Sequence, residues 1–293
     1  MRKLAIVLFG ILFLFPQQSF ANGQENYVAL GDSLAAGQTP YSQIDAGYTD
    51  MIALQLMRSG KLASFSKELA FPGYRVEEVI ESIQSEQAGV LLEKATLITI
   101  SAGANNVLPL ISHKATEGTL TYNQLSVNFT LNEVRIQMKE LLSQVQQKAP
   151  NASIYVVGYY FPYTSVHEEQ KSGADKALTM LNAILEKEAK LAGVNFVNVY
   201  SLFEGRAAQF LPNVSDVHPN QQGYRIMANG MLAMYSESPS IQLAEEDMPP
   251  PNPLTFEQIL AMRQANLMEH SPSDVEVAVQ HHSRSKKPFL IMA

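Results

Sequence analysis

Ser33 is the first residue in the chain whose type and setting could support nucleophilic chemistry. It lies in the segment Gly31–Leu34, which directly follows the apolar run Tyr27–Leu30. A serine at a tight strand-to-helix turn can project its hydroxyl into a crevice, and its own N–H can face a bound oxyanion. The same serine could instead cap the following helix, which is the more common role of such a residue. The segment alone therefore leaves both roles open.

His218 is the histidine best placed to act as the base that a serine nucleophile needs. Asp216 precedes it by two positions, so in an extended segment both side chains point the same way. The carboxylate could then hold the imidazole in one tautomer. A histidine before proline is often a plain surface residue, and the nearby carboxylate is what favours catalysis here. The other five histidines lie in polar loops or near the C-terminus: His113, His167, His270, His281 and His282.

Two further segments could supply donors to a negatively charged oxygen. Asn105 follows the apolar run Leu97–Ile100, and an amide at the mouth of a parallel sheet can donate to an oxyanion while staying neutral. Gly73 offers a position where the backbone can approach a ligand closely. Plainer roles remain open, because Asn105 or Asn106 could cap a helix and Gly73 could belong to an ordinary turn.

Short apolar runs alternate with segments of helical period, and this alternation predicts the elements that must position these side chains. Such βαβ units form an α/β fold with a central parallel sheet that helices cover on both faces. Ligands of such sheets bind beyond the carboxyl ends of the strands, where the candidate residues fall. The expected strands cover 27–30, 67–71, 97–100, 154–157 and 196–199, and the expected helices cover 48–58, 75–83, 125–148, 174–191 and 221–235.

Composition excludes several classes of function. The 293 residues include 28 acidic and 21 basic side chains, and the net charge of −7 argues against a protein that binds nucleic acid. The chain has no cysteine, which rules out disulfides, a thiolate nucleophile, zinc–thiolate sites and iron–sulfur clusters. It contains neither a His-Glu-x-x-His run nor a glycine-rich phosphate loop, so we expect no metal and no other cofactor.

Residues 1–21 have the pattern of a secretory signal peptide. Arg2 and Lys3 precede the apolar run Leu4–Phe15, and the segment closes on Ala21. The apolar run is shorter than the roughly 20 residues that a membrane span requires, although an uncleaved anchor is the alternative. We therefore expect an exported protein, secreted and bacterial in origin, that has no stable membrane span.

Residues 237–293 are expected to form a proline-rich, partly disordered tail outside the 22–236 domain. They hold seven of the fifteen prolines. The segment Thr255–Gln258 has the spacing of a capping box and predicts one short helix that runs to Met268. Its apolar residues could dock on the main domain: Phe256, Ile259, Leu260 and Leu267.

Four ordered blocks together resemble the SGNH (GDSL) hydrolase family. They are Gly31–Leu34, Gly73, Gly103–Asn106 and Asp216–His218, and the resemblance covers about residues 25–236. The wider segment Gly31–Gly37 is similar to the secreted, bacillus-type lipase/esterase branch. The resemblance implies a three-layer α/β/α, flavodoxin-like fold that cleaves carboxylic esters through a Ser-His-Asp triad and an acyl-enzyme.

The resemblance also implies individual roles. Ser33 would be the nucleophile and His218 the base, and the N–H groups of Ser33 and Gly73 with the amide of Asn105 would form the oxyanion hole. The last block of the family usually places aspartate three residues before the histidine, where this chain has Ser215. Asp216 is our candidate orienter, and a Ser33–His218 dyad assisted by a backbone carbonyl is the alternative.

The substrate within the ester class stays open. Lipid esters, lysophospholipids, acetylated sugars and thioesters all suit this chemistry, because specificity lies in loops. The candidate loops are 38–46, 108–122 and 159–172, and the last carries an aromatic group that could line an acyl pocket or simply pack: Tyr159, Tyr160, Phe161 and Tyr163. Partners are thus small-molecule or lipid esters, and the sequence does not reveal an oligomeric state.

Two other functions compete with ester hydrolysis. A binding module of the same fold without catalysis is one of them. The order Ser64-x-x-Lys67, Ser126-x-Asn128 and Lys171–Gly173 is also found in penicillin-binding serine enzymes. Those short motifs have the wrong context, since Ser64 is not expected to open a long helix and Lys171 is expected in a loop.

Overall fold

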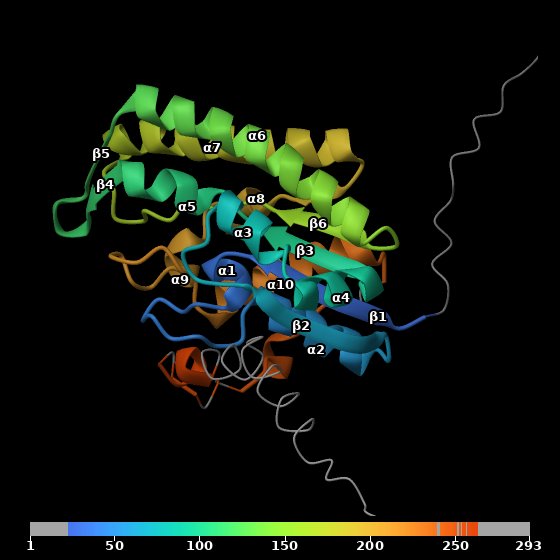
Figure 1. The fold of residues 1–293 in the computed structure, drawn as a ribbon. Helices are drawn as coiled ribbons and strands as arrows, with labels where there is room; N and C mark the ends of the chain where they lie inside the picture. The colour runs from blue at the N-terminus through green and yellow to red at the C-terminus, as the bar shows by residue number, and fades with distance from the viewer. Residues whose placement is uncertain (1–22, 239–240, 251, 253, 256, 263–293) are drawn as a thin grey trace, which may run out of the picture.

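A five-stranded parallel sheet forms the centre of the computed structural model, which describes residues 23–238, 241–250, 252, 254–255 and 257–262 (Figure 1). Its strands are β1 (Glu25–Gly31), β2 (Leu62–Ala70), β3 (Leu97–Ser101), β6 (Ser153–Val157) and β7 (Asn195–Val197), in the order β2-β1-β3-β6-β7. The chain leaves β1 toward β2 and returns to its other side as β3. This doubly wound order creates a crevice between the carboxyl ends of β1 and β3.

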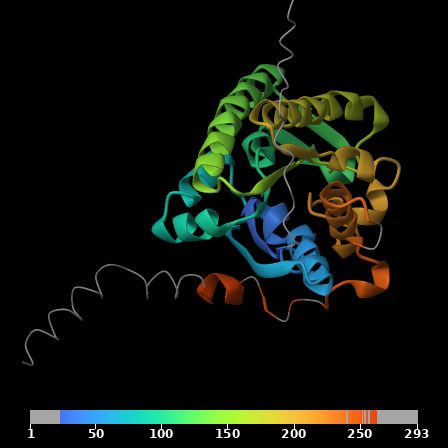
Figure 2. The same cartoon turned by 90° about the vertical axis from the view of Figure 1, so that its right-hand side faces the viewer.

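Helices cover both faces of the sheet. One layer contains α3 (Val76–Ser82), α4 (Glu86–Lys94), α6 (Gln124–Lys148) and α7 (Glu168–Ala192), and the opposite layer contains α2 (Tyr48–Arg58) and α10 (Gln221–Tyr235) (Figures 1 and 2). The predicted three-layer α/β/α fold is therefore confirmed. The predicted bounds of α2 and α10 agree with the structure at both ends.

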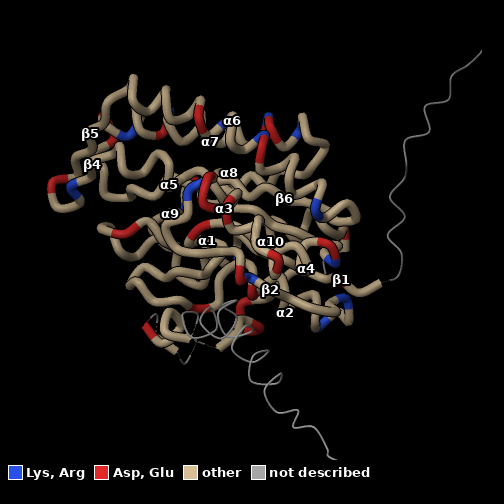
Figure 3. Tube along the Cα trace, in the orientation of Figure 1, with Lys and Arg blue, Asp and Glu red and all other residues tan. Residues whose placement is uncertain are grey.

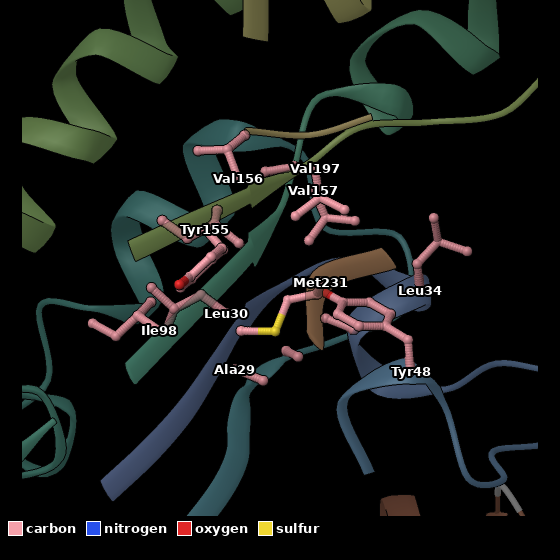
Figure 4. Packing of buried hydrophobic residues seen from close by; sticks show 14 of the residues in the cluster. Ala29, Leu30, Leu34, Tyr48, Ile98, Tyr155, Val156, Val157, Val197 and Met231 are labelled. Atoms are coloured by element: carbon pink, nitrogen blue, oxygen red, sulfur yellow. The ribbon is translucent and has the colours of Figure 1, made fainter. Parts of the chain in front are cut away.

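The core follows from strands that are apolar on both faces and helices that are apolar on one. Every residue of β3 is buried, as a central parallel strand requires. On α10, the buried residues Tyr224, Met227 and Met231 recur at helical spacing, and Asn220 caps the helix by accepting from the backbone N–H of Gly223 at 3.0 Å. Figure 4 shows Met231 beside Tyr48 of α2 under the sheet.

The segment 108–122, predicted to be a loop, contains a β-hairpin. Strands β4 (Ile111–Lys114) and β5 (Thr119–Tyr122) pair antiparallel, after the short helices α5 (Ala104–Val107) and η1 (Leu108–Leu110) and around the turn η2 (Ala115–Glu117). The hairpin lies at the end of the molecule where α1 (Ser33–Ala36), α5 and α9 (Ala207–Phe210) also lie (Figure 1). Lys114 and Glu117 form an ion pair at 3.3 Å, and opposite charges adjoin at its tip (Figure 3).

Several other elements differ from the sequence prediction, among them β2, which begins at Leu62 rather than near residue 67. Helix α7 begins at Glu168 rather than near residue 174, α4 was not predicted, and β7 ends at Val197 because α8 (Val199–Phe203) follows at once. Lys171 consequently lies in a helix and not in a loop, while Ser64 lies in strand β2. Neither position has the context that the penicillin-binding motifs require.

The segment beyond α10 packs on the domain. Ile241 and Leu243 are buried, and Leu243 exchanges two hydrogen bonds with the Asn229 side chain, at 2.7 and 3.0 Å. Further along, η4 (Glu245–Asp247) brings Asp247 to within 3.1 Å of the Arg58 guanidinium. The predicted boundary at residue 236 stays a prediction, and the described chain on its far side is held by apolar and polar contacts.

The expected capping box lies just after this segment. The hydroxyl of Thr255 accepts from the N–H of Gln258, whose side chain in turn accepts from the N–H of Thr255. Residues 257–262 are helical, and Ile259 packs against the core. The predicted signal peptide and the remainder of the tail helix, with Phe256 and Leu267, lie outside the described residues. In the part of the chain that is described, no helix is both long enough and apolar enough to cross a membrane.

Candidate active site

Ser33 opens helix α1 directly beyond the end of β1. Gly31 makes this turn possible, because its φ is +133° and a Cβ there would lie 2.1 Å from the carbonyl oxygen of Ser101. Asp32 is the N-cap, with a carboxylate oxygen that accepts from the N–H of Leu34 at 3.0 Å. The capping role left open for Ser33 therefore belongs to its neighbour, and the Ser33 hydroxyl has another partner.

That partner is His218, 185 positions later. Ser33 Oγ lies 2.8 Å from His218 Nε2, and His218 Nδ1 lies 2.7 Å from Asp216 Oδ1. With Nδ1–H donating to the carboxylate, Nε2 is the acceptor of the ring and the Ser33 hydroxyl donates to it. The fold thus brings the three residues singled out in the sequence into one hydrogen-bonded chain.

Asp216 makes two hydrogen bonds to the same residue, His218. Its Oδ1 accepts from the backbone N–H of His218 at 2.7 Å as well as from the ring. Partial burial favours a higher pKa for Asp216, but the hydrogen bonds from His218 outweigh it, so the pKa lies below its ordinary value of 3.8. A charged carboxylate is therefore available beside the imidazole. Ser215, the adjacent residue that the resemblance suggested as the alternative position for an orienting carboxylate, is exposed.

A backbone carbonyl in the same loop has a different role. The carbonyl of Val217 accepts from the Tyr160 hydroxyl at 2.7 Å, and the Tyr160 ring stacks on Phe203 with centroids 4.2 Å apart. This contact anchors the segment that carries His218 to the end of β6 and to α8. The imidazole Nδ1 has a carboxylate, and not this carbonyl, at hydrogen-bond distance.

The three proposed oxyanion donors come from different elements: Ser33 opens α1, Asn105 lies in α5, and Gly73 lies between β2 and α3. Asn105 lines the same pocket as Ser33, and its amide donates one hydrogen to the carbonyl oxygen of Tyr74 at 2.9 Å. That bond joins the amide to the loop of Gly73, which has a left-handed φ of +87°. Gly73 itself does not line the pocket. Asn106 instead contacts the start of α3, where its side-chain oxygen accepts from the N–H of Val76 at 3.1 Å.

Asp32 belongs to a buried network that the sequence analysis did not identify. Its carboxylate accepts from the hydroxyls of Ser101 at 2.9 Å and Tyr159 at 2.6 Å, in addition to the N–H of Leu34. Burial raises the pKa of Asp32, and these three hydrogen bonds act in the opposite direction. The positions of these residues in the sequence could have indicated the network, because Asp32, Ser101 and Tyr159 lie at or just beyond the ends of β1, β3 and β6.

A mainly apolar pocket extends from Ser33 and His218. Of the three predicted specificity loops, segments 108–122 and 159–172 contribute to its walls, whereas segment 38–46 does not. The four aromatic residues predicted in segment 159–172 all line the pocket, and two of them, Tyr159 and Tyr160, also pack in the core. The lining residues are Asp32, Ser33, Leu34, Ala104, Asn105, Val107, Leu108, Ile111, Tyr159, Tyr160, Phe161, Pro162, Tyr163, Ala174, Ala177, Leu178, Leu181, Val217 and His218.

The pattern of the GDSL-like lipase/acylhydrolase family matches residues 29–226, which is more than half of the chain. The protein belongs to this family. Lipase 1 of Streptomyces coelicolor is 27% identical over 199 residues, covering 62% of this chain and 72% of that protein. Family membership supports ester hydrolysis as the general reaction.

Solved structures share the fold at low sequence identity. The lipase Lip_vut3 from a goat rumen metagenome has a TM-score of 0.58 at 19% identity, over 71% of this chain and 95% of its own. A catalytic mutant of Axe2, an acetylxylan esterase from Geobacillus stearothermophilus, has a TM-score of 0.53 at 14% identity, over 76% and 96%. These similarities establish the architecture and leave the choice of ester to other evidence.

Proposed function

We propose that this member of the family is a serine hydrolase that cleaves carboxylic esters of the lipase/esterase type through an acyl-enzyme. The observation that carries the proposal is the 2.8 Å contact between Ser33 Oγ and His218 Nε2 at the mouth of an apolar pocket. A nucleophile and base at hydrogen-bond distance, with the base oriented by a third group, is the geometry that activates a serine.

In the proposed reaction, Ser33 attacks the ester carbonyl while His218 accepts its proton. The carbonyl oxygen becomes an oxyanion that the Ser33 and Gly73 N–H groups and the Asn105 amide would stabilise, each by about 3–4 kcal/mol. His218 then gives its proton to the leaving alcohol as the C–O bond breaks, which leaves the acyl group on Ser33. Water, deprotonated by His218, releases the acid and regenerates the serine.

Asp216 would hold the imidazole in the productive tautomer and stabilise the imidazolium that forms in each half-reaction. The position of its carboxylate 2.7 Å from Nδ1 supports this role over a dyad assisted by a backbone carbonyl. No step requires a metal or an organic cofactor.

The apolar pocket favours a lipase or esterase over a carbohydrate acetylesterase. Sugars are recognised through many hydrogen bonds, whereas aliphatic and aromatic side chains form most of this lining. Axe2 demonstrates only that the fold also serves acetylxylan, so acetylated sugars belong in the substrate panel.

The test is hydrolysis of p-nitrophenyl butyrate by the wild type, Ser33→Ala and Ser64→Ala. We expect turnover in the wild type and in Ser64→Ala, and a loss of at least about 10⁴-fold in Ser33→Ala. A fluorophosphonate probe should label the wild type and not Ser33→Ala. An inactive wild type would favour a binding module, and activity that survives in Ser33→Ala would refute the assigned nucleophile.

We also propose that the protein is exported and that residues 1–21 are removed. The basic start and short apolar run of this segment support the proposal. N-terminal sequencing of the protein recovered from culture medium should begin at Asn22. Recovery of an intact Met1 from the membrane fraction would refute it.

A further inference from the structure

The pocket beside Ser33 continues away from the reacting groups along helix α7. Ala174, Ala177, Leu178 and Leu181 line it, and their spacing of three, one and three positions places them on one face of the helix. Ala174, Ala177 and Leu181 are almost completely buried. These side chains lie beneath the protein surface, and the two alanines are the smallest of the four side chains that α7 contributes to the pocket.

The hairpin and its neighbours form the opposite wall. Leu108 and Ile111 line the pocket from η1 and β4, and both pack against a small apolar cluster separate from the main core. The cluster consists of Leu120, Tyr163, Val166 and Ala174. Within it, Tyr163 also contacts the ring of His113 with centroids 4.6 Å apart. This wall of the pocket is thus held in place by packing against its own apolar cluster.

The chemistry of the lining limits what can bind. Among the described residues that line the pocket, Asp32 is the only carboxylate, and both of its oxygens already accept hydrogen bonds within the protein. The Tyr159 and Tyr160 hydroxyls likewise donate to Asp32 and to the Val217 carbonyl. The far part of the pocket therefore offers contact area to an apolar group and no unpaired charge to a polar one.

We propose that this pocket is the acyl site, and that Ala174 and Ala177 set the length of the fatty acyl chain that the enzyme accepts. The inference rests on the proposed function, because it concerns the group attached to Ser33 in the acyl-enzyme. The substrates are esters of unbranched short and medium-length fatty acids, and acetate esters leave the alanine-lined part unfilled.

The pocket suits the acyl group better than the alcohol for a kinetic reason. The acyl chain stays on Ser33 until water attacks, so an apolar site beside Ser33 can hold it throughout both half-reactions. The alcohol must leave past His218, and water must take its place there. An alcohol enclosed between α7 and the hairpin would obstruct that exchange.

The test uses p-nitrophenyl esters with one alcohol and four acyl lengths: acetate, butyrate, octanoate and palmitate. The measured quantity is the ratio of kcat/KM for octanoate to kcat/KM for acetate. We expect a ratio of at least about ten in the wild type, since each methylene bound in an apolar pocket contributes about tenfold or more. Ala177→Leu should lower the ratio at least about tenfold by filling the pocket.

Two further variants control the result. Ala183→Leu makes the same change on the exposed side of α7 and should leave the ratio at the wild-type value. Leu178→Ala enlarges the pocket and should move the best substrate toward longer chains. This second variant tests the proposal in the opposite direction, so a failure of Ala177→Leu to fold does not prevent a decision.

The outcomes distinguish a failure of the acyl site from a failure of the proposed function. A wild type that prefers acetate, or equal ratios in Ala177→Leu and Ala183→Leu, overturns the acyl site while esterase activity dependent on Ser33 stands. A second series uses acetate esters of alcohols of increasing length. If Ala177→Leu lowers kcat/KM more for the longer alcohols, the pocket holds the leaving group, and the acyl site is overturned. Absence of hydrolysis of every ester overturns both.

Discussion

Tyr159 donates its hydroxyl to the carboxylate of Asp32 at 2.6 Å, although 127 positions separate the two residues. Asp32 directly precedes the candidate nucleophile Ser33 and also accepts from the Ser101 hydroxyl. One buried carboxylate therefore joins the carboxyl ends of β1, β3 and β6. Its hydrogen bonds hold the turn that presents Ser33.

Replacement of Tyr159 by Phe removes one donor to this buried carboxylate. We expect the free energy of unfolding to fall by about 1.5–3 kcal/mol, the range for hydrogen bonds to charged groups. Urea denaturation measures the loss. Tyr200→Phe is the matched control, because its hydroxyl donates to the less buried carboxylate of Asp175, and its effect should be smaller. Equal losses in the two variants would contradict a special role for Asp32.

The pKa of Asp216 predicts how its contribution to stability depends on pH. Folding lowers this pKa below 3.8, so the group stabilises the protein above that value and loses its contribution as pH falls through the folded pKa. The stability difference between wild type and Asp216→Asn should therefore be largest near neutral pH and shrink as the pH falls below 3.8. A difference that grows on acidification would show that folding raises the pKa.

Activity of Asp216→Asn tests whether the carboxylate orients His218. We expect kcat to fall by about 10⁴-fold, as for a residue that fixes the tautomer of a catalytic imidazole. The control is Ser215→Ala, because Ser215 adjoins Asp216 and its side chain is exposed, and its kcat should stay within about twofold of wild type. A loss of less than about tenfold in Asp216→Asn would favour the dyad.

Asn105 and Asn106 are adjacent residues with different expected effects. Asn105→Ala removes a proposed oxyanion donor and should lower kcat by about 10²–10³-fold with little change in KM. Asn106→Ala removes an acceptor for the N–H of Val76 and should reduce stability by about 1 kcal/mol, with a much smaller effect on kcat. Steady-state kinetics and urea denaturation distinguish the two. Comparable kcat losses would contradict the assignment of the donor to Asn105.

Gly31→Ala tests the turn itself. An added Cβ would meet the Ser101 carbonyl at 2.1 Å in a left-handed backbone, so we expect a loss of about 3 kcal/mol or more. Gly89→Ala on α4 is the control, because a Cβ there meets nothing within 4 Å, and it should stabilise the protein by up to about 1 kcal/mol. Thermal unfolding of both variants gives the comparison.

The strongly periodic parts of the fold were predictable from sequence. Helix α10 is predictable at both ends because its apolar residues recur regularly, and in the structure Asn220 caps its first turn. The proximity of Ser33 and His218 is also predictable, since both residues follow strands of the alternating units on their carboxyl side. Family membership and fold are confirmed, and the roles of individual site residues remain proposals.

Other parts depended on tertiary contacts that no local pattern reveals. Strands β4 and β5 have four residues each, too few for a clear alternation, and they are stabilised by packing with Tyr163. The start of α7 was obscured by Gly173, a residue of low helix propensity, yet a Cβ there would lie 2.6 Å from the Tyr122 hydroxyl. The Asp32 network required three strands to be placed side by side, which spacing along the chain cannot show.

The docked residues beyond α10 affect how the enzyme can be shortened for study. A fragment ending at residue 236 would remove Leu243 and leave the Asn229 amide without the two backbone partners that it has in the full chain. It would also uncover the apolar surface beneath Ile241 and release Arg58 from Asp247. Expression fragments should therefore extend at least through residue 252, where the Asn252 N–H donates to Asp45, if they are to stay soluble and compact.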